Sequence, residues 1–321
     1  MKRIGKFLVP VLLTVMIVAG CGGQTKKEQP APKVDTITIS YVKLPLNIPS
    51  IVEKKQTLFE KEFGKENIKV VFPEITEGPK MTEAMAAGSL DFSNALGGTS
   101  AILAASNGVK LKVIGMYSRA PKAFTLMAKD PAIQTVADLK GKQVAGPKGT
   151  ILHQLLLAAE AKAGLKADDV AFVNMGIPPA VTAMMNGNVA AALVAGPAVS
   201  QAVAAGAHIV TTGEGLLDAT IVIAVREDFL TKHPDLVKRY MNVHATSLQY
   251  MKDHPDEVYK MTAEETGLSV EQVKNMYGLY DFDPTIKESD IVDLEKTQEF
   301  LKQNGMLTKP IDIRSMIAVV K

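Results

Sequence analysis

Short apolar runs alternate with segments of helical spacing along most of the chain. In the first half, apolar runs of strand length enclose stretches whose apolar residues recur three and four positions apart. The expected strands are residues 36–42, 68–72, 90–95 and 110–117, and the expected helices are residues 49–63, 80–87 and 100–106. Alternating strands and helices predict an α/β fold in which the strands pair in parallel.

The same order returns with an offset of about one hundred residues. Strands are expected at residues 143–145, 170–174, 190–194 and 208–211, and helices at residues 150–163, 181–185 and 198–205. Gly88 and Gly187 end equivalent helices, where glycine readily takes the left-handed conformation. A chain of strands and helices can place glycines at such intervals without a repeat, but the shared order predicts two halves built on one plan.

Two apolar segments, residues 123–129 and 220–226, join these halves. Both are typical of extended strands, and two strands crossing between the halves would form a hinge. From Glu227 onward the chain is amphipathic and helical, and we expect it to pack on the first half. The expected C-terminal helices are residues 234–252, 256–265, 269–277 and 288–304. The expected division is lobe I, residues 35–122 and 227–321, and lobe II, residues 123–226 including the hinge strands.

The N-terminus carries the features of an export signal. Basic residues at positions 2, 3 and 6 precede an apolar run over residues 7–18, which is shorter than the roughly twenty residues that span a bilayer. Val18-Ala19-Gly20-Cys21 then resembles the lipobox of bacterial lipoproteins. We expect residues 1–20 to be a cleaved signal peptide, Cys21 to carry a lipid, and residues 21–34 to form a flexible tether. The alternative is a chance cysteine after an ordinary signal peptide.

Composition and charge exclude several classes of function. Without residues 1–20, the chain has 33 Lys and Arg against 34 Asp and Glu. It therefore lacks the excess of positive charge that is typical of nucleic-acid-binding proteins. Cys21 is the only cysteine, so the body holds no disulfide and no cysteine-based metal site. The histidines, at positions 153, 208, 233, 244 and 254, show no metal-ligand pairing, and signatures of common enzymes are missing. We therefore expect no catalytic residue, metal or cofactor. The body should be a monomer held by lipid at the extracytoplasmic face of a membrane.

Two glycine-containing loops are candidate ligand contacts, because ligands of open α/β sheets bind at the carboxyl ends of strands. Each loop follows an expected strand and opens a helix, whose free N–H groups favour an anion. The predicted contacts are Gly97, Gly98 and Thr99 in the first loop and Gly149 and Thr150 in the second. Helix capping alone explains such residues equally well.

Three further residues are candidate ligand contacts, and each has an alternative structural role. Asn47 ends the loop after the first strand and could contact a ligand or cap the next helix. His153 lies one turn into the helix after Gly149, where a core or solvated position is the alternative. Met175 begins an apolar loop, residues 175–179, that could form a wall of the site or a simple turn.

The motif Asp138-Leu139-Lys140-Gly141-Lys142-Gln143-Val144, followed by Gly149-Thr150, is similar to a central stretch of known importer proteins. It resembles the substrate-binding proteins of ABC importers for aliphatic sulfonates, taurine and nitrate. Gly88-Ser89-Leu90-Asp91 matches the first-lobe motif of that family, and Lys232-His233-Pro234 matches a helix start. The resemblance covers roughly residues 36–250.

This resemblance implies a type II periplasmic-binding fold, in which two α/β lobes close on a small solute by a hinge. It implies delivery of the solute to a permease driven by an ATPase. It also implies that Gly98-Thr99 and Gly149-Thr150 face the ligand, and it matches Pro197 to a proline of the family. Ala195 stands where an aromatic residue commonly precedes that proline, which leaves the ligand open.

A small organic anion resembling a sulfonate is the favoured ligand. Nitrate-like ions, amino-acid-like compounds and heteroaromatic vitamin precursors are the other candidates. An alternative function is an enzyme on the same scaffold, similar to the pyrimidine-precursor synthases of thiamine pathways, but those need a cysteine-rich active site. A ligand-binding sensor is the third class, and the sequence does not separate it from an import receptor.

Overall fold

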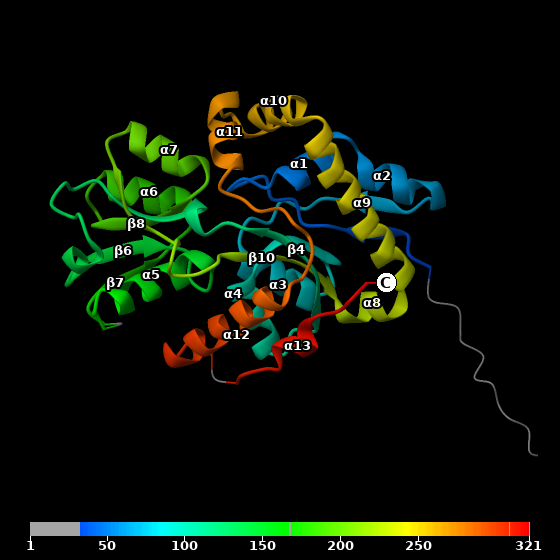
Figure 1. The fold of residues 1–321 in the computed structure, drawn as a ribbon. Coiled ribbons are helices and arrows are strands. Elements are labelled where there is room, and N and C mark those ends of the chain that lie inside the picture. The colour runs from blue at the N-terminus through cyan, green and yellow to red at the C-terminus, as the bar shows by residue number, and fades with distance from the viewer. Residues whose placement is uncertain (1–32, 167, 308, 321) are drawn as a thin grey trace, which may run out of the picture. The chain divides into compact units, whose positions relative to one another are not determined.

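The computed structural model describes residues 33–321 apart from residues 167, 308 and 321 (Figure 1). The predicted signal peptide, the predicted lipid anchor Cys21 and most of the predicted tether lie outside the described residues. Within the described part, no helix combines the length and the apolar character needed to cross a bilayer.

The strands form two groups with the same internal order. In the first group the order is β2 (Lys69–Val71), β1 (Thr36–Thr38), β3 (Phe92–Gly97), β10 (Thr220–Arg226) and β4 (Leu111–Arg119), where an isolated bridge between Ile39 and Phe92 links β1 to β3. In the second, the order is β7 (Ala171–Asn174), β6 (Gln143–Gly146), β8 (Ala191–Ala195), β5 (Phe124–Ala128) and β9 (His208–Thr212). We name these groups sheet I and sheet II. Their matching order confirms the predicted repeat.

The predicted parallel pairing is wrong for the strands expected at residues 110–117 and 208–211, β4 and β9, because each pairs with an antiparallel crossing strand. β1 pairs with β2, and β6 pairs with β7 and β8, in parallel. β10 is antiparallel to β3 and β4, and β5 is antiparallel to β8 and β9. β5 and β10 each enter a sheet directly after a strand of the other sheet, without a crossover helix, and therefore run against their neighbours. The predicted lobe boundaries stay a prediction, and β10 lies within sheet I.

Helices cover both sheets. The helices that lie between strands along the chain are α1 (Ile48–Lys55), α2 (Leu58–Phe63), α3 (Gly78–Ala86), α4 (Gly98–Ser106), α5 (Ile151–Lys162), α6 (Ile177–Met185) and α7 (Pro197–Ala204). In Figure 1, α5 lies below sheet II and α6 above it. The single helix predicted over residues 49–63 is wrong, because Thr57 takes a left-handed φ of 50° and separates α1 from α2. Gly88 and Gly187 end their helices with φ of 74° and 76°, as predicted.

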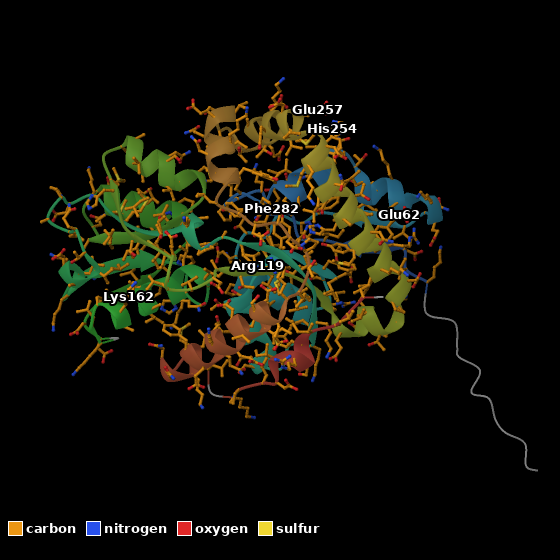
Figure 2. The ribbon with its side chains drawn as sticks, viewed as in Figure 1. Glu62, Arg119, Lys162, His254, Glu257 and Phe282 are labelled. Carbon is orange, nitrogen blue, oxygen red and sulfur yellow. The ribbon has the colours of Figure 1, made fainter. Side chains whose placement is uncertain are left out.

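The C-terminal part packs on elements of sheet I, as its amphipathic pattern predicts. It comprises α8 (Glu227–Lys232), α9 (Pro234–Asp253), α10 (Pro255–Thr266), α11 (Val270–Tyr277), α12 (Glu288–Gln303) and α13 (Ile313–Met316). α9 and α10 contact α1, and α12 contacts α4. Tyr240 of α9 stacks on Phe92 of β3 with ring centroids 4.1 Å apart. Arg119 at the end of β4, labelled in Figure 2, donates to Asp290 of α12 at 2.5 Å. These contacts fix α9 and α12 against sheet I.

Candidate functional site

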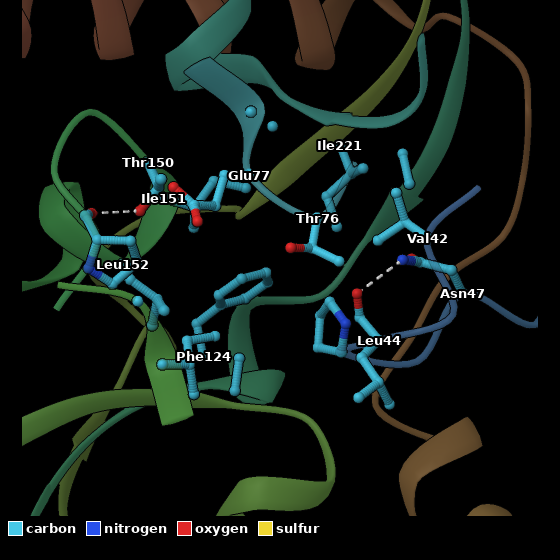
Figure 3. A pocket seen from close by; sticks show the side chains of 18 of the residues that line it. Val42, Leu44, Asn47, Thr76, Glu77, Phe124, Thr150, Ile151, Leu152 and Ile221 are labelled. Carbon is cyan, nitrogen blue, oxygen red and sulfur yellow. Dashed lines mark hydrogen bonds between the residues drawn. The ribbon is translucent and has the colours of Figure 1, made fainter. Parts of the chain in front are cut away.

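A cavity of about 290 Å³ opens where the parallel strands of both sheets end (Figure 3). Six helices, α1, α3, α4, α5, α6 and α7, begin at its wall. The residues around it are Val42, Leu44, Pro45, Asn47, Thr76, Glu77, Gly78, Met81, Ala95, Gly97, Ser100, Phe124, Pro147, Thr150, Ile151, Leu152, Gly176, Ile177, Pro178, Ala195, Pro197, Ala198 and Ile221. The cavity is therefore built by both halves of the chain, as expected of a shared binding site.

The predicted site residues divide into two groups. Asn47, Gly97, Thr150 and Pro197 line the cavity. The others do not belong to its lining: Gly98, Thr99, Gly149, His153 and Met175. The loop that Met175 begins does contribute Gly176, Ile177 and Pro178, so part of the predicted apolar wall is present. Which residues touch a ligand stays a prediction.

Thr99 is occupied by a contact between helices. Its Oγ1 donates to Oε1 of Gln154 on α5 at 2.5 Å, and Nε2 of Gln154 donates to Oγ1 of Thr297 on α12 at 3.1 Å. The side chains of all three residues are buried. Thr99 therefore helps to join α4, α5 and α12, and its hydroxyl proton points away from the cavity.

Gly98 serves close packing, and Gly149 serves a left-handed turn. A Cβ atom on Gly98 would lie 2.8 Å from Leu294 Cδ2 and 3.1 Å from the carbonyl oxygen of Thr220. Gly149 takes a left-handed φ of 71°, and its carbonyl oxygen accepts a hydrogen bond from Ser100 Oγ at 2.8 Å. Gly98 therefore lets α4 approach β10 and α12, and Gly149 lets the loop before α5 turn.

His153 supports the loop between β6 and α5 from inside the protein. Its Nδ1 faces the N–H of Gly149 at 3.4 Å, and its ring stacks on Phe172 with centroids 4.3 Å apart. Burial, with a smaller contribution from the charge of Lys148, lowers the pKa of His153 to about 4. The imidazole is therefore neutral at pH 7 and accepts the hydrogen bond from Gly149. Met175 likewise packs against the core of sheet II.

Asn47 precedes α1 without capping it. Its Nδ2 donates to the carbonyl oxygen of Leu44 at 3.2 Å, drawn as a dashed line in Figure 3, and its side chain makes no capping bond. This bond fixes the loop over residues 44–47, which forms one wall of the cavity. Across the cavity, a Cβ atom on Gly196 would lie 2.4 Å from the carbonyl oxygen of Pro45. The loop therefore packs against the start of α7, backbone on backbone.

The helix starts differ in the donors that they offer. First-turn N–H groups have no acceptor within their own helix, and proline has no N–H. Proline occupies the first turn of α1, α3, α6 and α7 but not of α4 or α5. Ser100 of α4 and Thr150 before α5 line the cavity beside these two helix starts. The positive ends of α4 and α5 thus form the end of the cavity best suited to an anion.

Charged side chains are scarce around the cavity. Among the described lining residues Glu77 is the only charged one. Lys80, outside the lining, pairs with Glu77 at 2.8 Å, and Arg119 is engaged by Asp290. Lys43 and Lys148 do not line the cavity either. An anion here would be held by backbone dipoles and not by a lysine or arginine.

Phe124 and Ile221 are lining residues that sequence reasoning missed. They lie at the starts of β5 and β10, the two crossing strands. Phe124 pairs with Ala195 at the end of β8, and Ile221 pairs with Gly97 at the end of β3. An antiparallel strand begins at the sheet edge where its neighbours end. The first residues of the two predicted crossing strands could therefore have been recognised as candidate lining residues. With Leu44, Met81 and Ile177, they give the cavity an apolar wall.

The matching sheets, the crossing strands and the cavity between the halves define a periplasmic-binding-protein fold. The alkanesulfonate-binding protein SsuA from Xanthomonas axonopodis pv. citri bound to MOPS has the same fold, with a TM-score of 0.82 and 24% identity over 90% of this chain and 100% of that chain. Residues 49–258 match the model of the NMT1/THI5-like family, and this chain belongs to that family.

Two relatives that match most of the chain are binding proteins by name. A putative aliphatic sulfonates-binding protein of Bacillus subtilis is 30% identical over 97% of this chain and 94% of its own length. The taurine-binding periplasmic protein of Escherichia coli is 27% identical over 82% of this chain and 79% of its own length. The similarity to the Bacillus subtilis protein therefore extends over nearly all of the chain.

Proposed function

We propose that this protein is the extracytoplasmic receptor of an ABC importer and that it captures a sulfonate-like organic anion in the cavity. The observation that carries the proposal is the pair of proline-free helix starts, α4 and α5, facing one cavity in a relative of sulfonate-binding proteins. The permease with its ATPase would be the partner. Lipid on Cys21 would hold the receptor at the outer face of the membrane.

The acid group binds at the starts of α4 and α5 in this proposal. The free backbone N–H groups of the first turns donate to the sulfonate oxygens, and the helix dipoles favour the negative charge. The hydroxyls of Ser100 and Thr150 already donate to the carbonyl oxygens of Gly149 and Pro147, at 2.8 Å each. The backbone of α4 and α5 therefore supplies the main donors.

The remainder of the ligand packs on the apolar wall. This wall carries no positive charge among its described residues and is made by Leu44, Met81, Phe124, Ile177 and Ile221. Burial of apolar ligand surface against them contributes roughly 25 cal/mol per Å². A volume of about 290 Å³ is close to the lower end of small-ligand pockets, so it suits a small organic sulfonate better than an inorganic ion.

Capture requires closure and no covalent chemistry. We propose that the division into lobes I and II describes the moving parts, with hinges where the chain passes between sheets I and II. Contacts such as those between Pro45 and Gly196 would form on closure, desolvate the ligand and complete the surface that the permease recognises. The cysteine-rich site of the alternative enzyme class has no counterpart in the body, since Cys21 is the only cysteine. A sensor would share the binding step but not the permease.

The test removes one backbone donor while keeping the helix. Ile151 is the first residue of α5, and Thr150 before it has φ of −119° and ψ of 173°, which proline tolerates as its preceding residue. Ile151→Pro therefore deletes a single N–H from the anion end. Ile151→Val is the matched control, because it trims the side chain and keeps the N–H.

Binding would be measured by calorimetry on residues 21–321 carrying Cys21→Ser, with a panel of alkane- and arenesulfonates, nitrate, amino acids and pyrimidines. We expect at least one sulfonate to bind, with an affinity about ten- to hundredfold lower in Ile151→Pro, as for loss of a hydrogen bond to a charged group. Ile151→Val should stay near wild type. Binding of neutral heteroaromatics alone, or equal affinity of both variants, would refute the anion site.

A further inference from the structure

Glu77 is placed at the anion end of the cavity. It precedes α3, and the next residue, Gly78, packs directly on α4: a Cβ atom on Gly78 would lie 2.4 Å from Ser100 Oγ. Glu77 lines the cavity, and in Figure 3 it lies on the side of the pocket away from Asn47. A carboxylate therefore stands next to the helix starts that would hold an acid group.

The charge of Glu77 is only partly balanced by its neighbour. Lys80 Nζ donates to Oε1 of Glu77 at 2.8 Å, and the two side chains are 63% and 40% exposed. Water screens an ion pair that is exposed to this extent. The described residues supply no hydrogen-bond donor to Oε2, so one oxygen of the carboxylate is available to a ligand.

A bound sulfonate without a positive group would place two negative charges side by side. The other described lining residues carry no formal charge, so only the starts of α4 and α5 and the exposed Lys80 counter this repulsion. Like charges held close together in a partly desolvated site repel strongly. A ligand that carries an ammonium group near its acid group removes the conflict, because the ammonium can donate to Oε2 of Glu77.

We propose that Glu77 is a specificity residue that selects zwitterionic aminosulfonates over plain sulfonates of the same shape. This inference rests on the proposed function and adds the class of the ligand. The starts of α4 and α5 bind the sulfonate, Glu77 binds the ammonium, and Lys80 holds the carboxylate in place from the solvent side. Substituents on the ammonium or the carbon chain extend onto the apolar wall.

The test compares ligands that differ only in the ammonium group. Taurine and 1-propanesulfonate form one pair, and 2-(cyclohexylamino)ethanesulfonate and 3-cyclohexylpropane-1-sulfonate form a larger pair for the apolar wall. Affinities would be measured by calorimetry at pH 7 on residues 21–321 with Cys21→Ser, for wild type and for Glu77→Gln, which keeps the shape of the side chain. Glu83→Gln, an exposed position on α3, is the matched control.

In wild type and in Glu83→Gln, we expect the ammonium member of the pair that binds to be preferred roughly tenfold, as for a hydrogen bond between charged groups. In Glu77→Gln the preference should fall to about one, through weaker binding of the aminosulfonate and tighter binding of the plain sulfonate. The melting temperature without ligand reports whether each variant is folded. Lys80→Met, which frees Oε1, should increase the preference.

Two results would overturn the inference: equal affinity of wild type for both members of a pair, or an unchanged preference in Glu77→Gln. In either case sulfonates still bind, and the proposed function stands. Failure of every sulfonate to bind wild type would instead refute the proposed function. The two failures are therefore distinguishable in one set of titrations.

Discussion

Glu160 of α5 offers a test of the structure that needs no ligand. Its side chain is buried, 3% exposed, and Oε2 has no hydrogen-bond partner among the described residues. Burial raises the pKa of Glu160 from its ordinary 4.5 to about 7, and the charge of Asp169 adds to the shift. Near pH 5 the folded protein therefore keeps a proton on this carboxyl group that the unfolded chain releases.

The sign of the effect on stability follows from this difference. Below pH 4.5 Glu160 is protonated in the folded and the unfolded state, and its ionisation costs no stability. The free energy of unfolding falls as the pH rises through the folded pKa of about 7. Each pKa unit corresponds to about 1.4 kcal/mol, so the loss approaches about 3 kcal/mol at pH 8. Glu160→Gln keeps the shape of the side chain and cannot ionise, so it removes this loss.

Thermal melts at pH 4.5 and pH 8 measure the difference. The melting temperature of Glu160→Gln should match wild type at pH 4.5 and exceed it at pH 8 by about 6–12 °C, since 1 kcal/mol shifts a domain of this size class by about 2–4 °C. Glu264→Gln, at an exposed position of α10, should show no such dependence. If the gap between Glu160→Gln and wild type is the same at both pH values, the carboxyl group does not titrate as its burial implies.

Two more predictions concern the loops around the cavity. The pKa of His153 is lowered from 6.5 to about 4. The neutral imidazole therefore makes its full contribution to the free energy of unfolding above pH 6.5, and this contribution is lost as the pH falls through 4. Melts of wild type against His153→Phe, which retains a ring to stack on Phe172, should therefore diverge toward acid pH, and parallel curves would contradict this. Gly196→Ala should lower sulfonate affinity by about tenfold or more, because its Cβ meets Pro45. Gly206→Ala, with a left-handed φ of 91° but open space around it, controls for backbone strain, and equal affinities would show that the contact is unimportant.

Local features of the sequence predicted most of the elements. Gly88 and Gly187 mark helix ends because only a residue without Cβ takes φ of 74° to 76° at no cost. The repeated order of strands and helices led to the matching order of sheets I and II. The break at Thr57 was not predictable from spacing, since apolar positions continue on one face across it. The direction of β5 and β10 depends on where the chain crosses, which local periodicity does not encode.

The site could be located from the sequence but not resolved into contacts. The glycine loops before α4 and α5 do meet at the cavity, through Gly97 and Thr150. Whether a hydroxyl faces the cavity or a neighbouring helix depends on partners far away, as Gln154 and Thr297 show for Thr99. The role suggested for Glu77 required the packing of Gly78 on Ser100, a contact between separate helices.

The exchange of strands between the sheets has a consequence for how the chain folds. β3 and β4 of sheet I do not pair with each other. Both pair with β10, which is more than one hundred residues later in the chain. Contacts of such long sequence separation form slowly, because loop closure must precede them. Sheet I cannot be completed until residues 220–226 have been synthesised. We therefore expect sheet II, whose strands all lie within residues 124–212, to be able to form before sheet I during synthesis.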